Sequence, residues 1–92
     1  MLERTVTIRN ALGMHARAAA RFVHAAGAFQ CRITVTREDR GDRRVDGKSI
    51  LGLLLLAAAR GVAIRITAEG ADEADALGML CRLVEAGFGE ES

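Results

Sequence analysis

The residues best suited to chemistry lie in one short stretch, residues 12–17. His15 stands where a predicted turn containing Asn10 and Gly13 gives way to an alanine-rich helix over residues 16–26. The first N–H groups of a helix have no partner within it, and the helix dipole makes that end positive. A phosphate placed there gains hydrogen bonds and a favourable field. The same positive end favours a neutral imidazole, whose lone pair can attack phosphorus.

Two further features of this stretch suit phosphate. Arg17 offers a planar guanidinium that matches phosphate oxygens. We expect the backbone N–H groups of Ala16 and Arg17 to cradle those oxygens, while Gly13 lets the turn approach closely. A histidine at a helix start can also be a simple cap or a solvated residue, and spacing alone leaves that alternative open.

The surrounding pattern predicts the elements that position this stretch. Alternating apolar and polar residues predict strands over residues 2–9, 32–36, 44–46 and 62–68. Helical spacing predicts a second helix that Ser49 caps and Arg60-Gly61 ends, and a third with Asp72 and Glu73 in its first turn. The order β-α-β-β-α-β-α, with right-handed crossovers and one-sided strands, predicts an α+β fold. We expect a four-stranded antiparallel sheet with three helices on one face.

The periodicity also predicts which side chains are buried. The first helix is expected to bury Ala19, Phe22, Val23 and Ala26, and the third Ala74, Leu77, Leu80, Cys81 and Val84. Gly87 and Gly89 should end the third helix, leaving residues 90–92 as a frayed tail. Residues 37–43 are charged and predict a long hairpin loop with a solvated tip.

The second helix is unusually apolar. If Leu53 and Leu56 face the core, Ile50, Leu51 and Leu54 fall outside it. An exposed apolar patch on a small protein indicates a docking surface. The alternative is an especially buried helix, which we disfavour because one sheet with three helices cannot bury a helix all round.

Composition narrows the function classes. The chain has 92 residues, half of them hydrophobic, and a formal net charge of +1, which predicts one domain over residues 1–92. It has no Trp or Tyr and only three Phe, which disfavours an RNA-binding domain or any nucleic-acid partner. The N-terminus lacks the apolar core of a signal peptide, and residues 50–59 are too few to span a bilayer. We therefore expect a cytoplasmic protein without membrane insertion.

The other residues with reactive side chains are predicted to have no catalytic or ligand-binding role. Cys31 and Cys81 are predicted to be buried thiols, and His24 a surface residue. Gly47-Lys48-Ser49 resembles the end of a P-loop, but Asp42 stands where that loop needs its first glycine, so we reject nucleotide binding. No metal site and no organic cofactor are expected.

Three blocks of this sequence resemble one family. Residues 13–17, Gly-Met-His-Ala-Arg, closely resemble the active-site motif of HPr, the histidine-containing phosphocarrier of the bacterial sugar phosphotransferase system. Residues 46–54 and 70–77 match further blocks in the family's order, and the likeness covers essentially the whole chain. The resemblance implies the open-faced β-sandwich of that family. It also implies that His15 accepts a phosphoryl group on Nδ1 from phosphorylated enzyme I and passes it to enzyme II A domains, as a carrier with no turnover alone.

The resemblance implies regulation as well. In many family members the serine matching Ser49 is phosphorylated by an HPr kinase/phosphorylase, whereas a simple N-cap needs no such role. We expect a monomer whose Ile50, Leu51 and Leu54 dock both partners in turn. The alternative function is a regulatory HPr-like docking module of a phosphotransferase network not committed to sugar uptake. Ala18 replaces a proline common in the family, a change that should keep the helix.

Overall fold

A computed structural model of the chain describes residues 1–41 and 43–90. Over these residues it contains four strands and three α-helices in the predicted order, together with two one-turn 3₁₀ helices that were not predicted. The elements are β1 (Leu2–Thr7), α1 (Ala16–Ala26), β2 (Arg32–Arg37), η1 (Glu38–Arg40), β3 (Arg44–Asp46), α2 (Ile50–Leu56), β4 (Ala63–Glu69), α3 (Glu73–Glu85) and η2 (Gly87–Gly89). Asp42 of the predicted hairpin loop and residues 91–92 of the predicted tail lie outside the described residues.

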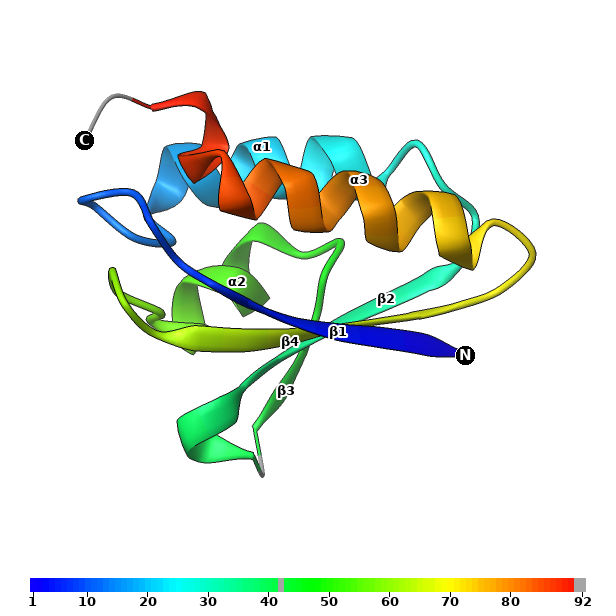
Figure 1. The fold of residues 1–92 in the computed structure, drawn as a ribbon, viewed down its shortest axis with the longest axis horizontal. Coiled ribbons are helices and arrows are strands. Elements are labelled where there is room, and N and C mark those ends of the chain that lie inside the picture. The colour runs from blue at the N-terminus through cyan, green and yellow to red at the C-terminus, as the bar shows by residue number, and fades with distance from the viewer. Residues whose placement is uncertain (42, 91–92) are drawn as a thin grey trace.

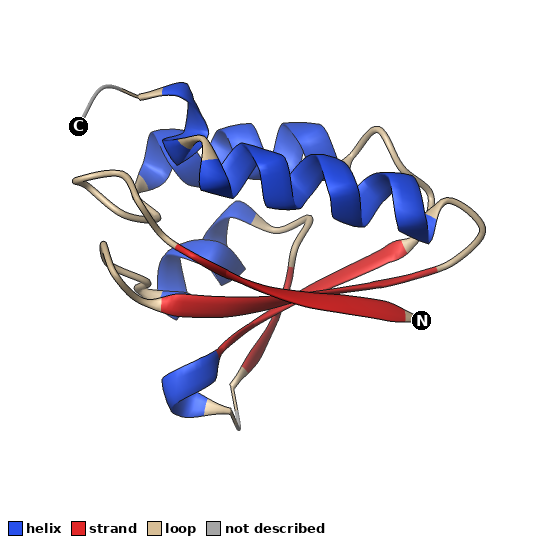
Figure 2. Cartoon of the chain, in the orientation of Figure 1, coloured by secondary structure: helices blue, strands red, loops and turns tan. Residues whose placement is uncertain are grey.

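The strands form one antiparallel sheet in the order β1-β4-β2-β3. Alternate residues of β4 face the core, where Ile64, Ile66 and Ala68 are buried. Val6 and Val35 lie beside them in register on β1 and β2. The three α-helices cover this face (Figures 1 and 2). The predicted α+β architecture is confirmed.

Helix α1 packs closely because its buried stripe is made mostly of alanine. Ala18, Ala19, Phe22 and Ala26 are fully buried, and Val23 is partly buried. Small side chains let the helix axis approach the sheet, and Phe22 fills the remaining space. The predicted stripe is confirmed.

Helix α2 is shorter than predicted. It begins at the Ser49 cap but ends at Leu56, before Arg60-Gly61, with Ala57 in the left-handed conformation at φ +54°. The reason is Arg37, which was predicted to lie in a solvated loop but is buried at the end of β2. Its Nη1 donates to the carbonyls of Leu56 and Ala57 and so caps the helix end.

Helix α3 confirms four of its five predicted core residues. Leu77, Leu80, Cys81 and Val84 are buried, but Ala74 is exposed, and Ala76 is buried in its place. At 100° per residue, Ala74 falls at the edge of the stripe on the open first turn.

The predicted frayed tail is wrong for Glu90. After α3 the chain reverses through η2, where Gly87 and Gly89 take positive φ and Phe88 is buried. Burying one large apolar side chain ties the segment to the core. Glu90 is thereby carried back towards the start of α1.

Candidate functional site

The turn before α1 is held in place by backbone contacts. The Gly13 N–H donates to the Asn10 carbonyl over 3.1 Å, and the Met14 N–H donates to the Ala58 carbonyl over 2.9 Å. Gly13 has φ +66°, and a Cβ there would lie 2.6 Å from the Ala58 carbonyl oxygen. Conformation and close packing therefore both require glycine here, and this packing fixes where α1 begins.

The His15 ring is oriented through both of its nitrogens. His15 is the N-cap of α1, and its Nδ1 accepts a hydrogen bond from the Arg17 N–H over 3.3 Å. Its Nε2 lies 2.6 Å from Oε2 of Glu90. An ionised carboxylate can only accept, so these partners assign the ring proton to Nε2 and a lone pair to Nδ1. The side chain is 25% exposed, so the ring remains accessible.

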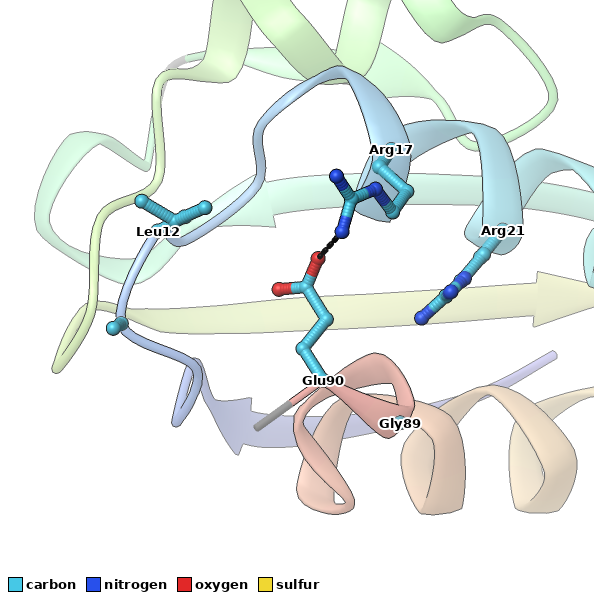
Figure 3. A pocket seen from close by; sticks show the side chains of 6 residues that line it. Leu12, Arg17, Arg21, Gly89 and Glu90 are labelled. Atoms are coloured by element: carbon cyan, nitrogen blue, oxygen red, sulfur yellow. Dashed lines mark ion pairs between the residues drawn. The ribbon is translucent and has the colours of Figure 1, made fainter. Parts of the chain in front are cut away.

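Glu90 is the site residue that sequence reasoning missed. Its side chain is only 9% exposed. Oε1 accepts from Nδ2 of Asn10 over 2.8 Å, and Oε2 lies 3.9 Å from Nη1 of Arg17 (Figure 3). The one signal in the sequence is Phe88, an apolar residue between two glycines in an otherwise polar segment. Such a residue indicates an anchored segment.

The Glu90 carboxyl is held in its ionised form. Burial raises the pKa of this carboxyl, but hydrogen bonds from Asn10 and His15 and the positive charge of Arg17 outweigh that effect. Its pKa therefore lies below the ordinary value. Glu90 carries a negative charge at neutral pH.

An open hollow of about 360 Å³ lies beside the Glu90 carboxylate (Figure 3). Its lining residues are Ala11, Leu12, Arg17, Arg21, Gly89 and Glu90. Arg17 is 67% exposed, whereas Arg21 is fixed by a hydrogen bond from its Nη1 to the Phe88 carbonyl. Two guanidinium groups beside the first turn of α1 make this hollow favourable for an anion.

The structure brings His15, Ala16 and Arg17 together at the start of α1, with one difference from expectation. The Arg17 amide, expected to be free for phosphate, donates to the His15 ring. Ser49 caps α2, where its Oγ accepts from the Gly52 N–H over 3.0 Å. The loop that follows α2 contacts the site, because the Ala58 carbonyl accepts from the Met14 N–H.

The apolar surface of α2 is larger than expected. Leu53 and Leu56 are buried. We call the four exposed apolar residues of the helix the leucine patch: Ile50, Leu51, Leu54 and Leu55. Sequence reasoning named the first three and did not include Leu55.

The remaining candidates take structural roles. Lys48 donates from Nζ to the Phe29 carbonyl over 2.7 Å, and a Cβ at Gly47 would lie 2.5 Å from Cγ2 of Ile33. Residues 46–49 therefore form a packed turn rather than a phosphate loop. Cys31 and Cys81 are buried free thiols, as predicted.

Residues 1–41 and 43–90 contain neither a metal-binding cluster nor a membrane-spanning helix. This part of the chain has no group of three or more His, Cys, Asp or Glu side chains placed to hold a metal ion. It also has no helix with the length and apolar character needed to cross a membrane.

Comparison with known proteins places the chain in a class. The family described as "PTS HPr component phosphorylation site" matches residues 2–86. The phosphocarrier protein HPr of Neisseria meningitidis serogroup A is 46% identical over 90 residues, which cover 98% of each chain. The phosphocarrier protein NPr of Shewanella violacea is 42% identical over 91 residues, 99% of this chain and 97% of that one.

A solved structure agrees. The crystal structure of HPr-C-His from Thermoanaerobacter tengcongensis has a TM-score of 0.91 and 40% identity, and each chain is covered completely. The fold and these matches define a phosphocarrier protein of the phosphotransferase system. Within that class, the chain belongs to the HPr family, which confirms the resemblance seen in its sequence blocks.

Proposed function

We propose that this chain carries a phosphoryl group on Nδ1 of His15, taken from phosphorylated enzyme I and passed to an enzyme II A domain. The supporting observation is the state of the ring, which has a lone pair on Nδ1, a proton on Nε2 and a partly exposed face. Residues 1–92 serve as one cytoplasmic carrier domain, a monomer that turns nothing over alone and uses no metal or organic cofactor.

The transfer step involves few groups of the carrier. The Nδ1 lone pair attacks phosphorus while the N–P bond of the donor breaks and returns its electron pair to the donor nitrogen. Nδ1 gives up its hydrogen bond from the Arg17 N–H as the new bond forms. That amide and the Ala16 amide then bind phosphoryl oxygens, and the exposed Arg17 guanidinium joins them. The Arg17 amide, which donates to the His15 cap at rest, thus becomes a phosphate ligand.

The leucine patch supplies the apolar part of the interface with both partners. Leu51 is 67% exposed and Leu55 60% exposed, on a helix whose following loop is hydrogen-bonded to the His15 turn at Ala58. Exposed apolar groups of this kind mark binding surfaces. A single small patch suits partners that bind one after the other and dissociate quickly.

Ser49 is the proposed regulatory site, by its resemblance to the serine of the family. A phosphate adds about −1.5 to −2 charges, which a helix N-terminus tolerates. Because Ser49 directly precedes Ile50 of the leucine patch, this charge would weaken docking while leaving α2 folded. Incubation with an HPr kinase/phosphorylase and ATP should place phosphate on Ser49, and its absence there would count against this role.

The second candidate is a regulatory docking module of a phosphotransferase network not committed to sugar uptake. The chain is 42% identical to a phosphocarrier named NPr and 46% identical to the HPr relative, so its likeness is not limited to proteins named HPr. Presenting the phosphorylated chain to enzyme II A domains of the sugar and the regulatory type separates the two. Transfer to the sugar type supports the first candidate.

The central test is phosphorylation by phosphoenolpyruvate and enzyme I, with the modified residue mapped. Wild type should carry phosphate on His15, and His15→Ala should carry none. Arg17→Ala should slow transfer about tenfold or more, since a charged phosphate contact is lost, without changing the melting temperature. His24→Ala is the matched control because His24 is exposed on the last turn of α1, and it should behave as wild type. Phosphate on a histidine of His15→Ala would overturn the proposal.

A further inference from the structure

We propose that Glu90, aimed by Asn10, is a positioning residue for phosphoryl transfer at His15. Its carboxylate keeps the ring proton on Nε2 and balances the positive charge that the ring acquires when Nδ1 bonds phosphorus. The inference rests on the proposed carrier function and adds to it a residue 75 positions away along the chain.

Both oxygens of the Glu90 carboxylate have assigned partners. Oε2 lies 2.6 Å from Nε2 of His15, and Oε1 accepts from Asn10 over 2.8 Å. The side chain is 9% exposed, so little water competes for these contacts. A short hydrogen bond from a ring N–H to a shielded carboxylate fixes both the tautomer and the tilt of the ring.

The side-chain amide of Asn10 is held in an orientation that leaves its oxygen without a hydrogen bond from the described part of the chain, which is unfavourable for stability. Its Nδ2 uses both hydrogens, one on the Gly13 carbonyl over 2.8 Å and one on Glu90. Its Oδ1 is buried with no hydrogen-bond partner among the described residues. Exchanging the two ends of the amide would turn that oxygen towards a carbonyl and a carboxylate, so the orientation is fixed. An unsatisfied buried oxygen is costly, and such costs are typical of functional sites.

The segment that carries Glu90 is anchored rather than loose. The buried Phe88 side chain and the hydrogen bond from Arg21 to the Phe88 carbonyl hold η2 against α1. Positive φ at Gly87 and Gly89 allows the tight reversal between α3 and Glu90. The placement of the carboxylate is therefore built from several independent contacts.

The chemistry gives this carboxylate a defined part. When the Nδ1 lone pair forms the N–P bond, the ring becomes positively charged and its remaining proton stays on Nε2. A carboxylate 2.6 Å from that nitrogen stabilises the charge, as the acid of a hydrolase triad does for its histidine. When the phosphoryl group leaves for the acceptor, the N–P bond breaks, its electron pair returns to Nδ1, and the ring becomes neutral again. Arg17, now 3.9 Å from Oε2, is drawn to the phosphoryl group and leaves Glu90 to the ring.

The test uses the full chain with Glu90→Gln, Glu90→Ala and the control Glu85→Gln, an exposed acid on α3. Two readouts are needed: the rate of transfer from phosphorylated enzyme I, and the ¹H and ¹⁵N resonances of the His15 ring. In Glu90→Gln the side chain loses its charge and one of its two acceptor oxygens, while His15 Nε2 and Asn10 Nδ2 both still donate. The Nε2 proton resonance should therefore shift, and transfer should slow about tenfold. Glu90→Ala should slow transfer at least as much and should also shift or lose the Nε2 proton resonance. Glu85→Gln should match wild type in both.

The outcomes separate this inference from the carrier function. Wild type labelled on His15, together with both Glu90 variants transferring at the wild-type rate, overturns the role of Glu90 alone. Slowed transfer in Glu90→Ala with unchanged ring resonances also overturns it, because the effect then does not pass through the ring. Failure of wild type to take phosphate on His15 overturns the carrier function itself. If Glu90→Ala does not fold, the isosteric Glu90→Gln carries the test.

Discussion

At the residue scale, Gly13 decides where the reactive ring is presented. Its positive φ turns the chain into α1, and its missing side chain lets the turn lie against Ala58 and Ala59. The Met14–Ala58 hydrogen bond depends on that contact. His15 follows two residues after Gly13, so any displacement of the turn moves the ring away from Glu90.

We therefore predict that Gly13→Ala both destabilises the protein and slows phosphoryl transfer. An alanine in the left-handed region, with its Cβ pressed on a carbonyl, should lower the free energy of unfolding by about 2 kcal/mol or more. Urea denaturation measures this. Gly41→Ala is the control because Gly41 has φ −62° and open space around it, and it should change stability by less than about 0.5 kcal/mol. Equal stabilities of the two variants would contradict the argument.

Residues close together in sequence could be predicted as a site, and the distant one could not. His15 and Arg17 flank the start of one helix, a local feature that caps and glycines reveal. Glu90 reaches the ring only through the reversal at η2, which depends on burial of Phe88. No periodic pattern records such a contact, so the acidic end of the chain was expected to be frayed.

At the element scale, Asp72 ties α3 to the start of β2. The sequence suggested that it serves its own helix, but its carboxylate accepts from the N–H groups of Gln30, over 2.9 Å, and Cys31, over 3.0 Å. Hydrogen bonding from the Gln30 amide, helped by Cys31 and opposed by burial, lowers the pKa of this carboxyl below its ordinary value. The segment leading into β2 and the start of α3 are thus joined by an ionised group.

This linkage gives a prediction with a definite sign. A carboxyl whose folded pKa lies below its unfolded value stabilises the fold fully above the unfolded pKa, about 3.9. That contribution disappears as pH falls through the folded pKa. Asp72→Ala should therefore melt at a lower temperature than wild type at pH 7, and the gap should shrink below about pH 4. Asp75→Ala, an exposed acid of the same helix turn, should show no comparable gap, and a gap constant with pH would contradict this origin.

Element ends were less predictable than element types. The apolar run after Ser49 suggested a helix reaching Arg60, yet α2 ends at Leu56 because Arg37 caps it from β2. That arginine was assigned to a solvated loop since its neighbours are charged. A hydrogen bond from a side chain of one element to the end of another cannot be predicted from the residues next to it in the sequence.

At the scale of the whole molecule, one helix serves two purposes. Helix α2 buries Leu53 and Leu56 in the core and exposes the leucine patch. Because the two faces have separate surroundings, changes on one should leave the other intact. This separation allows binding and folding to be tested independently.

We predict that Leu51→Ala raises the KM of enzyme I for this carrier about tenfold and changes the free energy of unfolding by less than about 0.5 kcal/mol. The reason is that Leu51 is exposed and contributes to docking rather than to the core. Leu53→Ala, the buried counterpart, should lose about 2–5 kcal/mol of stability and, while folded, retain the wild-type KM. If Leu53→Ala raised the KM and Leu51→Ala did not, the leucine patch would not be part of the interface.

The global architecture was the most predictable property. A sheet covered on one face requires alternation with period two, and the strands display it plainly. The strand order β1-β4-β2-β3 was not predicted, because pairing between residues some sixty positions apart leaves no mark on a local pattern.

That strand order has a consequence for synthesis. Among residues 1–41 and 43–90, β1 pairs with β4 alone, so the first strand emerges from the ribosome long before its partner, Ala63–Glu69, has been made. During that interval the nascent segment presents unsatisfied backbone groups to any neighbouring chain. Glu3 and Arg4, which are exposed in the finished sheet, place charged side chains on this unpaired strand, and burying them against another chain is unfavourable.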